Sequence, residues 1–240
     1  MRIIFSRKGF DSSSGGGPSP IVAGRPVSLP IPAGAASRTT YGDLGLGEHA
    51  CKASRGRFGA RDLCHHDPMF LAEGTCLFGQ CGAAQTHLAN RGVGLGDVFL
   101  FFGLFRADGG DPHHRIYGYL EVEELIDLTR AVPRHLVERG HPHALALHAG
   151  NDVIYAGRGR QAASASDALR LSVSDGPPSL WKRPAWLAQG GLSYHDRPER
   201  WLRGGRLKSV ARGQEFVADI GRRKAPREWL ARTLDEIRAS

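Results

Sequence analysis

The fold is decided by two aromatic-rich stretches of sequence, VFLFFGLFR at residues 98–106 and RIYGYLEVE at residues 115–123. Aromatic and branched side chains favour strands, and the Gly- and Asp-containing loop at residues 107–114 is typical of a β-hairpin connection. The first stretch is apolar at nearly every position, which predicts a strand buried on both faces. The second alternates apolar and polar positions, which predicts that one of its faces contacts water.

Shorter signals along the chain predict the remaining elements. Besides the hairpin, the apolar patterns indicate strands at residues 1–6, 152–156, 168–173 and 215–218 and helices at residues 79–90 and 227–238. Strands outnumber helices and do not alternate with them. An α+β fold with a curved mixed sheet or partly open β-barrel and flanking helices is therefore favoured over a doubly wound α/β fold. A length of 240 residues suits a single domain over residues 1–240.

The composition excludes a wholly disordered protein and a membrane-spanning one. Hydrophobic residues make up 41% of the chain and charged residues 23%, as in ordinary globular proteins. The longest apolar runs have strand length, far below the roughly 20 residues of a membrane helix, and the N-terminus lacks the apolar block of a signal peptide. The four cysteines match no zinc-ribbon or zinc-finger spacing and suggest reduced thiols. We therefore expect a cytoplasmic protein.

The excess of positive charge is concentrated near the C-terminus. The chain has a formal net charge of +8, and residues 181–240 contain 14 basic and 7 acidic side chains. A basic segment attracts phosphates through an interaction that is independent of base sequence and is weakened by salt. The expected partner is therefore a nucleotide or a nucleic acid, although an Arg-rich surface without such a partner would have the same composition. Nothing in the sequence indicates a cofactor or an oligomeric state.

The first candidate site is the loop SRKGFDSSSGGG at residues 6–17, which follows the N-terminal strand. Cations, hydroxyls and unhindered backbone amides together are the groups that hold phosphates. The expected phosphate-binding residues are Ser6, Arg7, Lys8 and Ser12. Asp11 is the carboxylate best placed for a base or metal role. The order of Gly and Lys differs from a Walker A loop, and a plain mobile loop would share the Gly and Ser content.

A second candidate site is the turn CHHD at residues 64–67. An imidazole exchanges protons near neutral pH, and His66 is the expected general acid or base. Thiolate and imidazole also suit zinc, so a metal site formed by Cys64, His65 and His66 is an alternative. In the competing structural interpretation, Asp67 caps a helix that follows it and the histidines face water.

Three further segments supply side chains for base or phosphate recognition. The expected binding residues there are Gln80, Tyr194, His195, Arg212 and Gln214. Tyr194 would stack on a base while His195 serves as an acid or ligand, and tryptophans among cations surround both, as in surfaces that bind single strands. Glu215 is a candidate catalytic carboxylate, with an internal ion pair as the alternative. The histidines at residues 113–114 and 141–143 lie in predicted turns and are expected to face water.

The hairpin resembles a known fold. The stretches GDVFLFF at residues 96–102 and IYGYLEV at residues 116–122 resemble the barrel hairpin of PUA-like domains, which include the ASCH and EVE families. The resemblance implies a PUA-like core over roughly residues 94–220. PUA-like domains bind RNA or modified nucleobases in DNA, so the resemblance also implies binding of a nucleic acid or nucleobase.

A second resemblance extends over nearly the whole chain. In order, it rests on FSRKGFDS (5–12), GGPSP (16–20), Cys64, HDP (66–68), FGQ (78–80), the start and end of the stretch 96–106, and SVARGQEFV (209–217). Together these segments look like the third of the nucleotide modification associated domain families, which occur in bacteria and phages and are grouped with base-modification systems. The resemblance implies a role near modified nucleotides or DNA, with DNA favoured over RNA. It supplies no established reaction or catalytic residue.

These signals together predict a protein that binds a nucleotide or nucleobase in one basic pocket, which holds both a phosphate and a base. The first alternative is a base-modifying transferase or hydrolase that uses Asp11, His66 and Glu215. The second is a metal-dependent enzyme at Cys64, His65 and His66. Each interpretation requires segments that are distant in the chain to fold around one pocket.

Overall fold

The computed structural model describes residues 1–33, 37–211 and 215–239. Its strands are β1 (Arg2–Arg7), β2 (Ser19–Val22), β3 (Arg25–Pro26), β4 (Met69–Phe70), β5 (Thr75–Gln80), β6 (Val98–Ala107), β7 (His113–Asp127), β8 (Val153–Gln161), β9 (Leu180–Lys182), β10 (Trp201–Leu202), β11 (Arg206–Lys208) and β12 (Glu215–Asp219). Its helices are α1 (Gly47–Ser54), α2 (Gly82–Asn90), α3 (Arg134–Glu138), α4 (Pro142–Leu145) and α5 (Lys224–Arg238), with 3₁₀ turns η1 (Asp167–Leu169) and η2 (Pro198–Arg200).

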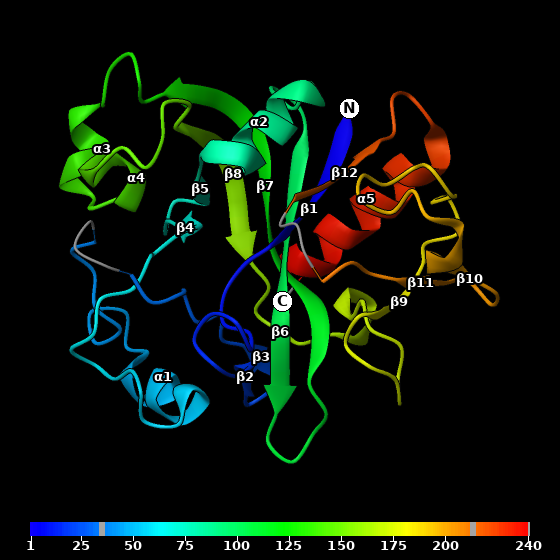
Figure 1. The fold of residues 1–240 in the computed structure, drawn as a ribbon, viewed down its shortest axis with the longest axis horizontal. Helices are drawn as coiled ribbons and strands as arrows, with labels where there is room; N and C mark the ends of the chain where they lie inside the picture. Colours follow the sequence, from blue (N-terminus) through cyan, green and yellow to red (C-terminus); the bar gives the residue numbers. More distant parts are fainter. Residues whose placement is uncertain (34–36, 212–214, 240) are drawn as a thin grey trace.

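A curved mixed sheet forms the centre of the structure (Figure 1). Strands β12, β1, β6, β7, β8, β5 and β4 lie side by side in that order, and β2 with β3 extends the sheet at β6. The β1–β6 and β2–β6 pairs are parallel, whereas the other pairs are antiparallel. The sheet curls into a half-barrel with a few helices beside it. This arrangement confirms the α+β class and the curved, partly open sheet.

The predicted hairpin is confirmed as β6 and β7, with a register shift between Phe101 and Phe102. β6 is buried on both faces, as predicted, because Leu100 belongs to the core on one side of the sheet and Phe101 to the core on the other. The predicted water-facing side of β7 is wrong. Ile116 lies in the first of these cores and Tyr117 in the second, so both faces of β7 are covered there.

The two cores are covered by different elements. Helix α5 and the segment at residues 169–210 cover one face of the sheet, where Leu230 and Trp181 are buried, and α2 covers the other through Leu88. The predicted C-terminal helix is therefore confirmed. The predicted strand at 168–173 is wrong, because this segment forms η1 and then only isolated bridges. None of the described helices is both long and apolar enough to cross a bilayer.

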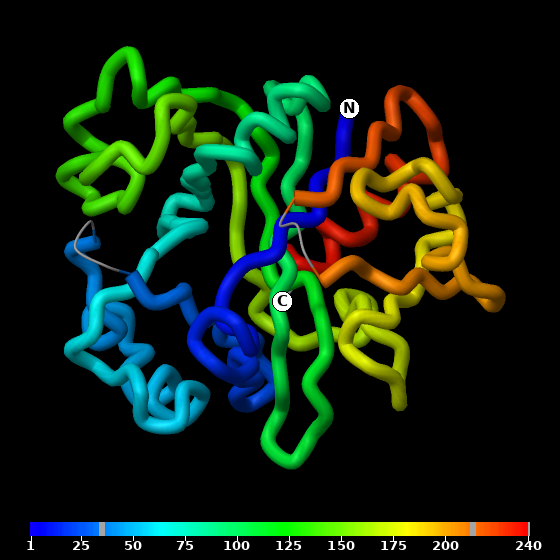
Figure 2. The backbone as a smooth tube through the Cα atoms, in the orientation of Figure 1, coloured from blue at the N-terminus to red at the C-terminus, as the bar shows by residue number. Residues whose placement is uncertain are grey.

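The sheet topology fixes the position of the glycine-rich loop. β1 pairs with the first half of β6 and β2 pairs with its second half. The chain therefore leaves the sheet after Arg7 and returns at Ser19 to pair with β6 again. Phe10 anchors the loop, because its ring is fully buried in a separate small core. Gly15 has a φ of +89°, and a Cβ there would lie 2.3 Å from the Phe10 ring. The N-terminal strand also pairs with β12, so a strand from the start of the chain and one from its C-terminal part lie side by side in the sheet (Figure 2).

Candidate functional site

Two adjoining cavities open beside the glycine-rich loop, and Gly9 and Asp67 belong to the walls of both. The smaller cavity has a volume of about 390 Å³ and the larger about 600 Å³. Segments that are far apart in the sequence line the smaller one. Its polar wall includes Arg7, Lys8, Asp11, His65, Gln80 and His143. The structure therefore brings four of the predicted site residues, from the end of β1, the loop after it and the end of β5, to one cavity.

Behind this wall, the buried carboxylate of Glu215 accepts hydrogen bonds from three side chains. Its Oε1 lies 3.1 Å from Ser6 Oγ, 2.9 Å from Lys8 Nζ and 2.8 Å from Gln80 Nε2. Its Oε2 is buried without a hydrogen-bond partner among the described residues. Lys8 Nζ also lies 4.4 Å from the centre of the Phe78 ring, within cation–π distance. Glu215 thus holds Lys8 and Gln80 at the wall but does not line the cavity itself.

Arg7 and Asp11 hold the N-terminal part of this wall in place. Arg7 donates to the backbone oxygens of residues 210 and 211, each at 2.8 Å. Burial lowers the pKa of Arg7, and the nearby charge of Asp11 partly offsets this. Asp11 Oδ1 accepts the N–H groups of Ser13 and Ser14 at 2.8 and 2.7 Å. Arg7 thus joins the N-terminal segment to the segment that precedes β12, and Asp11 fixes the turn within the loop.

Asp67 is surrounded by imidazoles on one side of the smaller cavity. Its Oδ1 accepts the backbone N–H of Gly79 at 3.0 Å and lies 3.6 Å from His141 Nε2. Its Oδ2 lies 3.9 Å from Nε2 of His65 and 3.9 Å from Nε2 of His143. The side chain of Asp67 is only 4% exposed. One carboxylate oxygen is thus held by the backbone, and the other faces two imidazole nitrogens.

A second carboxylate, Asp152, lies behind this cluster. Its Oδ1 is 2.5 Å from His143 Nδ1, and its Oδ2 accepts the backbone N–H of His148 at 2.8 Å. The rings of His143 and His148 are stacked with centroids 4.4 Å apart. Asp152 is fully buried, so it orients the two histidines without reaching the cavity.

The protonation states of the cluster follow from its burial and its charges. Burial alone would raise the pKa of Asp67, but the interaction with His141 and the neighbouring imidazoles lowers it below its usual value. Burial lowers the pKa of His65 to about 4, and the charge of Asp67 offsets this only in part. At neutral pH the cluster therefore has an ionised Asp67 beside a neutral His65.

The alternative metal site at Cys64, His65 and His66 is wrong, because these side chains point to three different places. Cys64 is fully buried in the small core with Phe10, and burial raises the pKa of its thiol to about 12. His66 lines the larger cavity and His65 the smaller one. The predicted helix cap is also wrong, because the chain continues from Asp67 into β4.

His66 is also separated from the other predicted catalytic residues. Asp11 lines the smaller cavity, His66 lines the larger one, and Glu215 lies behind the wall of the smaller one. The three therefore do not line one cleft.

The remaining predicted binding residues lie elsewhere. Ser12 is exposed on the loop. Tyr194 is 44% exposed and packs on His87, with ring centroids 4.4 Å apart. His195 is fully buried between the backbone groups of residues 193 and 210. Neither Tyr194 nor His195 lines the two cavities. Arg212 and Gln214 lie outside the described residues.

Three of the histidines that were expected to face water are buried. His113, His141 and His143 are at most 6% exposed, so the prediction that they face water is wrong. Helix α4 (Pro142–Leu145), with His141 immediately before it, packs against β5, and two of these histidines, His141 and His143, lie beside Asp67. Trp181 is also buried, and its Nε1 donates to His114 Nδ1 at 3.0 Å. It is a core residue and does not offer a stacking surface.

Sequence reasoning missed the segment HPHALALHAGND at residues 141–152 as part of the site. It supplies His143, His148 and Asp152, and its density of histidine and acidic residues was the available signal. What the sequence could not indicate is that α4 packs on β5 and so places this segment beside His65 and Asp67.

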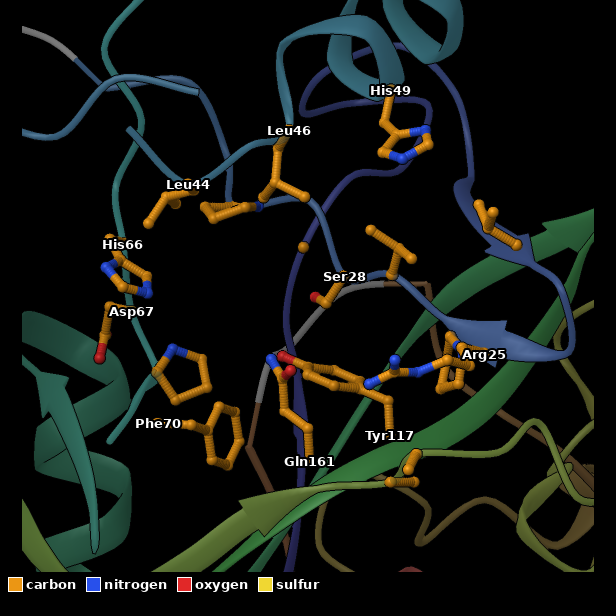
Figure 3. Close-up of a pocket in the computed structure, with 18 of the residues that line it drawn as sticks. Arg25, Ser28, Leu44, Leu46, His49, His66, Asp67, Phe70, Tyr117 and Gln161 are labelled. Atoms are coloured by element: carbon orange, nitrogen blue, oxygen red, sulfur yellow. The ribbon is translucent and has the colours of Figure 1, made fainter. Parts of the chain in front are cut away.

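The larger cavity has a different character (Figure 3). Tyr117, Gln161 and Phe70 lie along one side of it, and Leu44 and Leu46 lie opposite. Arg25, Ser28, His49 and His66 supply further polar groups to its wall. Aromatic and aliphatic walls with a few polar groups are typical of sites for planar organic ligands.

Comparison with known proteins identifies the family. The family model of nucleotide modification associated domain 3 matches residues 2–219. Searches of the curated proteins and of the solved structures gave no match. The matched range includes both cavities and the histidine cluster. The chain belongs to the nucleotide modification associated domain 3 family.

Proposed function

We propose that the protein binds a nucleotide, free or within a nucleic acid, across the two cavities, with the phosphate in the smaller one and the base in the larger one. The observation that carries this proposal is the shared wall at Gly9 and Asp67, which puts an ionic cavity directly beside an aromatic one. Their volumes fall within the range of small-molecule sites. Membership of a family associated with nucleotide modification supports a nucleotide as the ligand.

In this proposal, Arg7 and Lys8 bind the phosphate of the nucleotide. A lysine ammonium has three donor hydrogens and an arginine guanidinium five, and the bonds to Glu215 and to the backbone use only some of them. Charge-assisted hydrogen bonds from these remaining donors suit a phosphate oxygen.

In this proposal, four side chains of the larger cavity bind the base: Tyr117, Phe70, Gln161 and Arg25. The faces of aromatic rings stack on bases without strong sequence preference. Amide and guanidinium groups form paired hydrogen bonds with base edges, as Gln does with adenine and Arg with guanine. A purine or pyrimidine therefore finds both a stacking surface and edge partners in the larger cavity.

Calorimetric titration of the tag-free protein with the four deoxynucleoside monophosphates and the four matching nucleosides tests this function. We expect nucleotides to bind more tightly than nucleosides, because only nucleotides reach Arg7 and Lys8. Lys8→Met should weaken nucleotide binding about tenfold and nucleoside binding little. Gln161→Ala should change the preference among bases.

Lys224→Met is the matched control for Lys8→Met, because this lysine is 89% exposed on α5. It should leave both affinities unchanged. Absence of binding for all eight ligands, or equal losses for nucleotides and nucleosides in Lys8→Met, would contradict the proposed arrangement.

A further inference from the structure

We propose that His65, Asp67 and His143 bind one first-row divalent transition-metal ion, of the class of Zn²⁺ or Fe²⁺, at the wall of the smaller cavity. One ligand atom from each of these residues lies within 4.8 Å of the other two. The proposal rests on this cluster alone and does not require that a nucleotide binds.

The distances within the cluster suit an ion better than a direct contact. Asp67 Oδ2 lies 3.9 Å from Nε2 of both His65 and His143, which is too long for a hydrogen bond. Ligand atoms about 2.1 Å from a tetrahedral metal are about 3.4 Å apart. Binding an ion therefore requires each imidazole nitrogen to move about 0.5 Å closer to Asp67 Oδ2, and the two imidazole nitrogens, which lie within 4.8 Å of each other, to approach by up to about 1.4 Å.

The hydrogen bond of His143 to Asp152 determines which nitrogen faces the ion. Because Nδ1 lies 2.5 Å from Asp152, Nε2 is the nitrogen that faces Asp67. Nε2 and Asp67 Oδ2 are 3.9 Å apart, so they face each other without a direct hydrogen bond. A buried carboxylate that orients a histidine in this way is the usual outer support of a metal-binding imidazole.

The backbone of β5 positions the other ligand. The N–H of Gly79 fixes Asp67 Oδ1 at 3.0 Å, so that Oδ2 is the oxygen that faces the two imidazoles. The His143 ring packs directly on Gly79, and a Cβ added there would lie 2.2 Å from its Cδ2. A glycine is thus required at this position for His143 to reach Asp67.

A second group of metal-ligand residues, His143, His148 and Asp152, does not compete for the ion. Asp152 is fully buried, and both of its oxygens already accept hydrogen bonds from the other two residues. Its role is to orient the histidines, which makes it a positioning residue and not a ligand.

The chemistry of the ligands selects the class of metal. Two imidazoles and one carboxylate suit zinc, iron and manganese, whereas magnesium and calcium prefer oxygen ligands. Three protein ligands also leave at least one coordination position open. His65 and His143 line the smaller cavity, whose wall also includes Arg7 and Lys8. A phosphate would reach the metal there, a consequence that rests on the proposed function.

The test measures metal binding by the full-length, tag-free protein. After treatment with a chelator, the protein is titrated with Zn²⁺, with Co²⁺ as a spectroscopic probe and with Mg²⁺, and the bound metal is counted by mass spectrometry. We expect one equivalent of Zn²⁺ or Co²⁺ to bind and Mg²⁺ to bind at least a hundredfold more weakly. Retention of no Zn²⁺ or Co²⁺ above the level of Mg²⁺ would overturn the proposal.

Variants locate the ion. His65→Ala removes the most exposed ligand, with a side chain 20% exposed, and should weaken Zn²⁺ binding at least a hundredfold while the fold is retained. Asp152→Asn should weaken it by 10- to 100-fold and change the Co²⁺ spectrum. His66→Ala is the matched control, because the imidazole of His66, the next residue in the sequence, lines the larger cavity. Loss of metal in His66→Ala with retention in His65→Ala would contradict the assigned ligands.

If a ligand variant fails to fold, a variant that displaces the His143 ring provides a second test of the metal site. Gly79→Ala keeps all three ligands but pushes the His143 ring away from Asp67. It should weaken Zn²⁺ binding as strongly as His65→Ala does, whereas unchanged binding would count against His143. Nucleotide titrations of the metal-free and Zn²⁺-loaded protein then separate the two proposals. If the protein binds zinc but no nucleotide, the proposed metal site is supported and the proposed nucleotide-binding function is contradicted.

Discussion

At the scale of single residues, His114 illustrates how burial sets a charge. Its ring lies between Phe102 and Trp181, and its Nδ1 accepts a hydrogen bond from Trp181 Nε1 at 3.0 Å. Burial, together with a smaller effect of the charge of Arg7, lowers the pKa of His114 to about 3. His114 is therefore neutral in the folded protein at every pH above about 3.

The resulting prediction concerns stability against acid. Between pH 6.5 and about 3 the unfolded chain binds a proton at His114 and the folded chain does not, so stability falls as the pH falls through this window. The loss from this one group is up to about 1.4 kcal/mol per pH unit. Urea unfolding at pH 7, 6, 5 and 4 measures it. His114→Asn, which keeps an acceptor for Trp181, should show a shallower dependence, whereas His135→Asn on the exposed side of α3 should match the original protein.

How far the sequence predicts the site depends on whether a residue's role is local. Arg7, Lys8 and Asp11 were predictable, because cations, a carboxylate and glycines occur together in one loop after a strand. His143 and Asp152 were not, because a histidine that flanks a proline in a predicted turn looks solvated. The burial of His143 results from the packing of α4 against β5, which no local sequence pattern indicates.

At the scale of elements, Glu215 joins the ends of three strands. Ser6 and Lys8 come from β1 and the residue after it, Gln80 ends β5, and Glu215 begins β12. Its side chain is 1% exposed and that of Lys8 12%, so water screens their attraction little. Removing one member of such a pair leaves the other as a buried charge without compensation.

We therefore expect Glu215→Gln to lower the free energy of unfolding by about 3 kcal/mol, since the ammonium of Lys8 then lacks its counter-charge. Removing both charges in Lys8→Met/Glu215→Gln should cost less than the sum of the two single variants by at least about 1 kcal/mol. Guanidinium unfolding of the four proteins measures this difference. Additive costs would mean that the pair contributes no coupling and that strand packing alone joins these elements.

Elements were predictable where periodicity and burial agree. The hairpin of β6 and β7 and the amphipathic helix α5 have patterns that match their environments. The alternating pattern at 168–173 wrongly predicted a strand. Leu169 and Leu171 are indeed buried in the core, but a 3₁₀ turn and isolated bridges place them there. An alternating pattern reports that side chains are buried, but it does not show which backbone conformation buries them.

At the scale of the whole molecule, the two ends of the chain depend on each other. β1 lies between β12 and β6, so the N-terminal strand is complete only when the C-terminal strand has joined the sheet. Helix α5 then covers the core on one face with Leu230, Leu234 and Ile237. The family match ends at residue 219, so α5 lies outside it although it closes this core. We expect the whole chain to unfold as one cooperative unit.

Deleting residues 220–240 tests this expectation. The deletion removes α5 with Leu230, Leu234 and Ile237 and also the buried Ile220, and each such side chain contributes about 1.5–3 kcal/mol of burial. Their sum is comparable to the net stability of a typical protein of about 5–15 kcal/mol. The 1–219 chain should therefore aggregate or unfold without a cooperative transition. Leu230→Ala in the full chain should cost about 2–5 kcal/mol, whereas Leu95→Ala, at a side chain 69% exposed, should cost little. A 1–219 chain that stays monomeric and unfolds in one sharp urea transition would show that the matched region folds independently of α5.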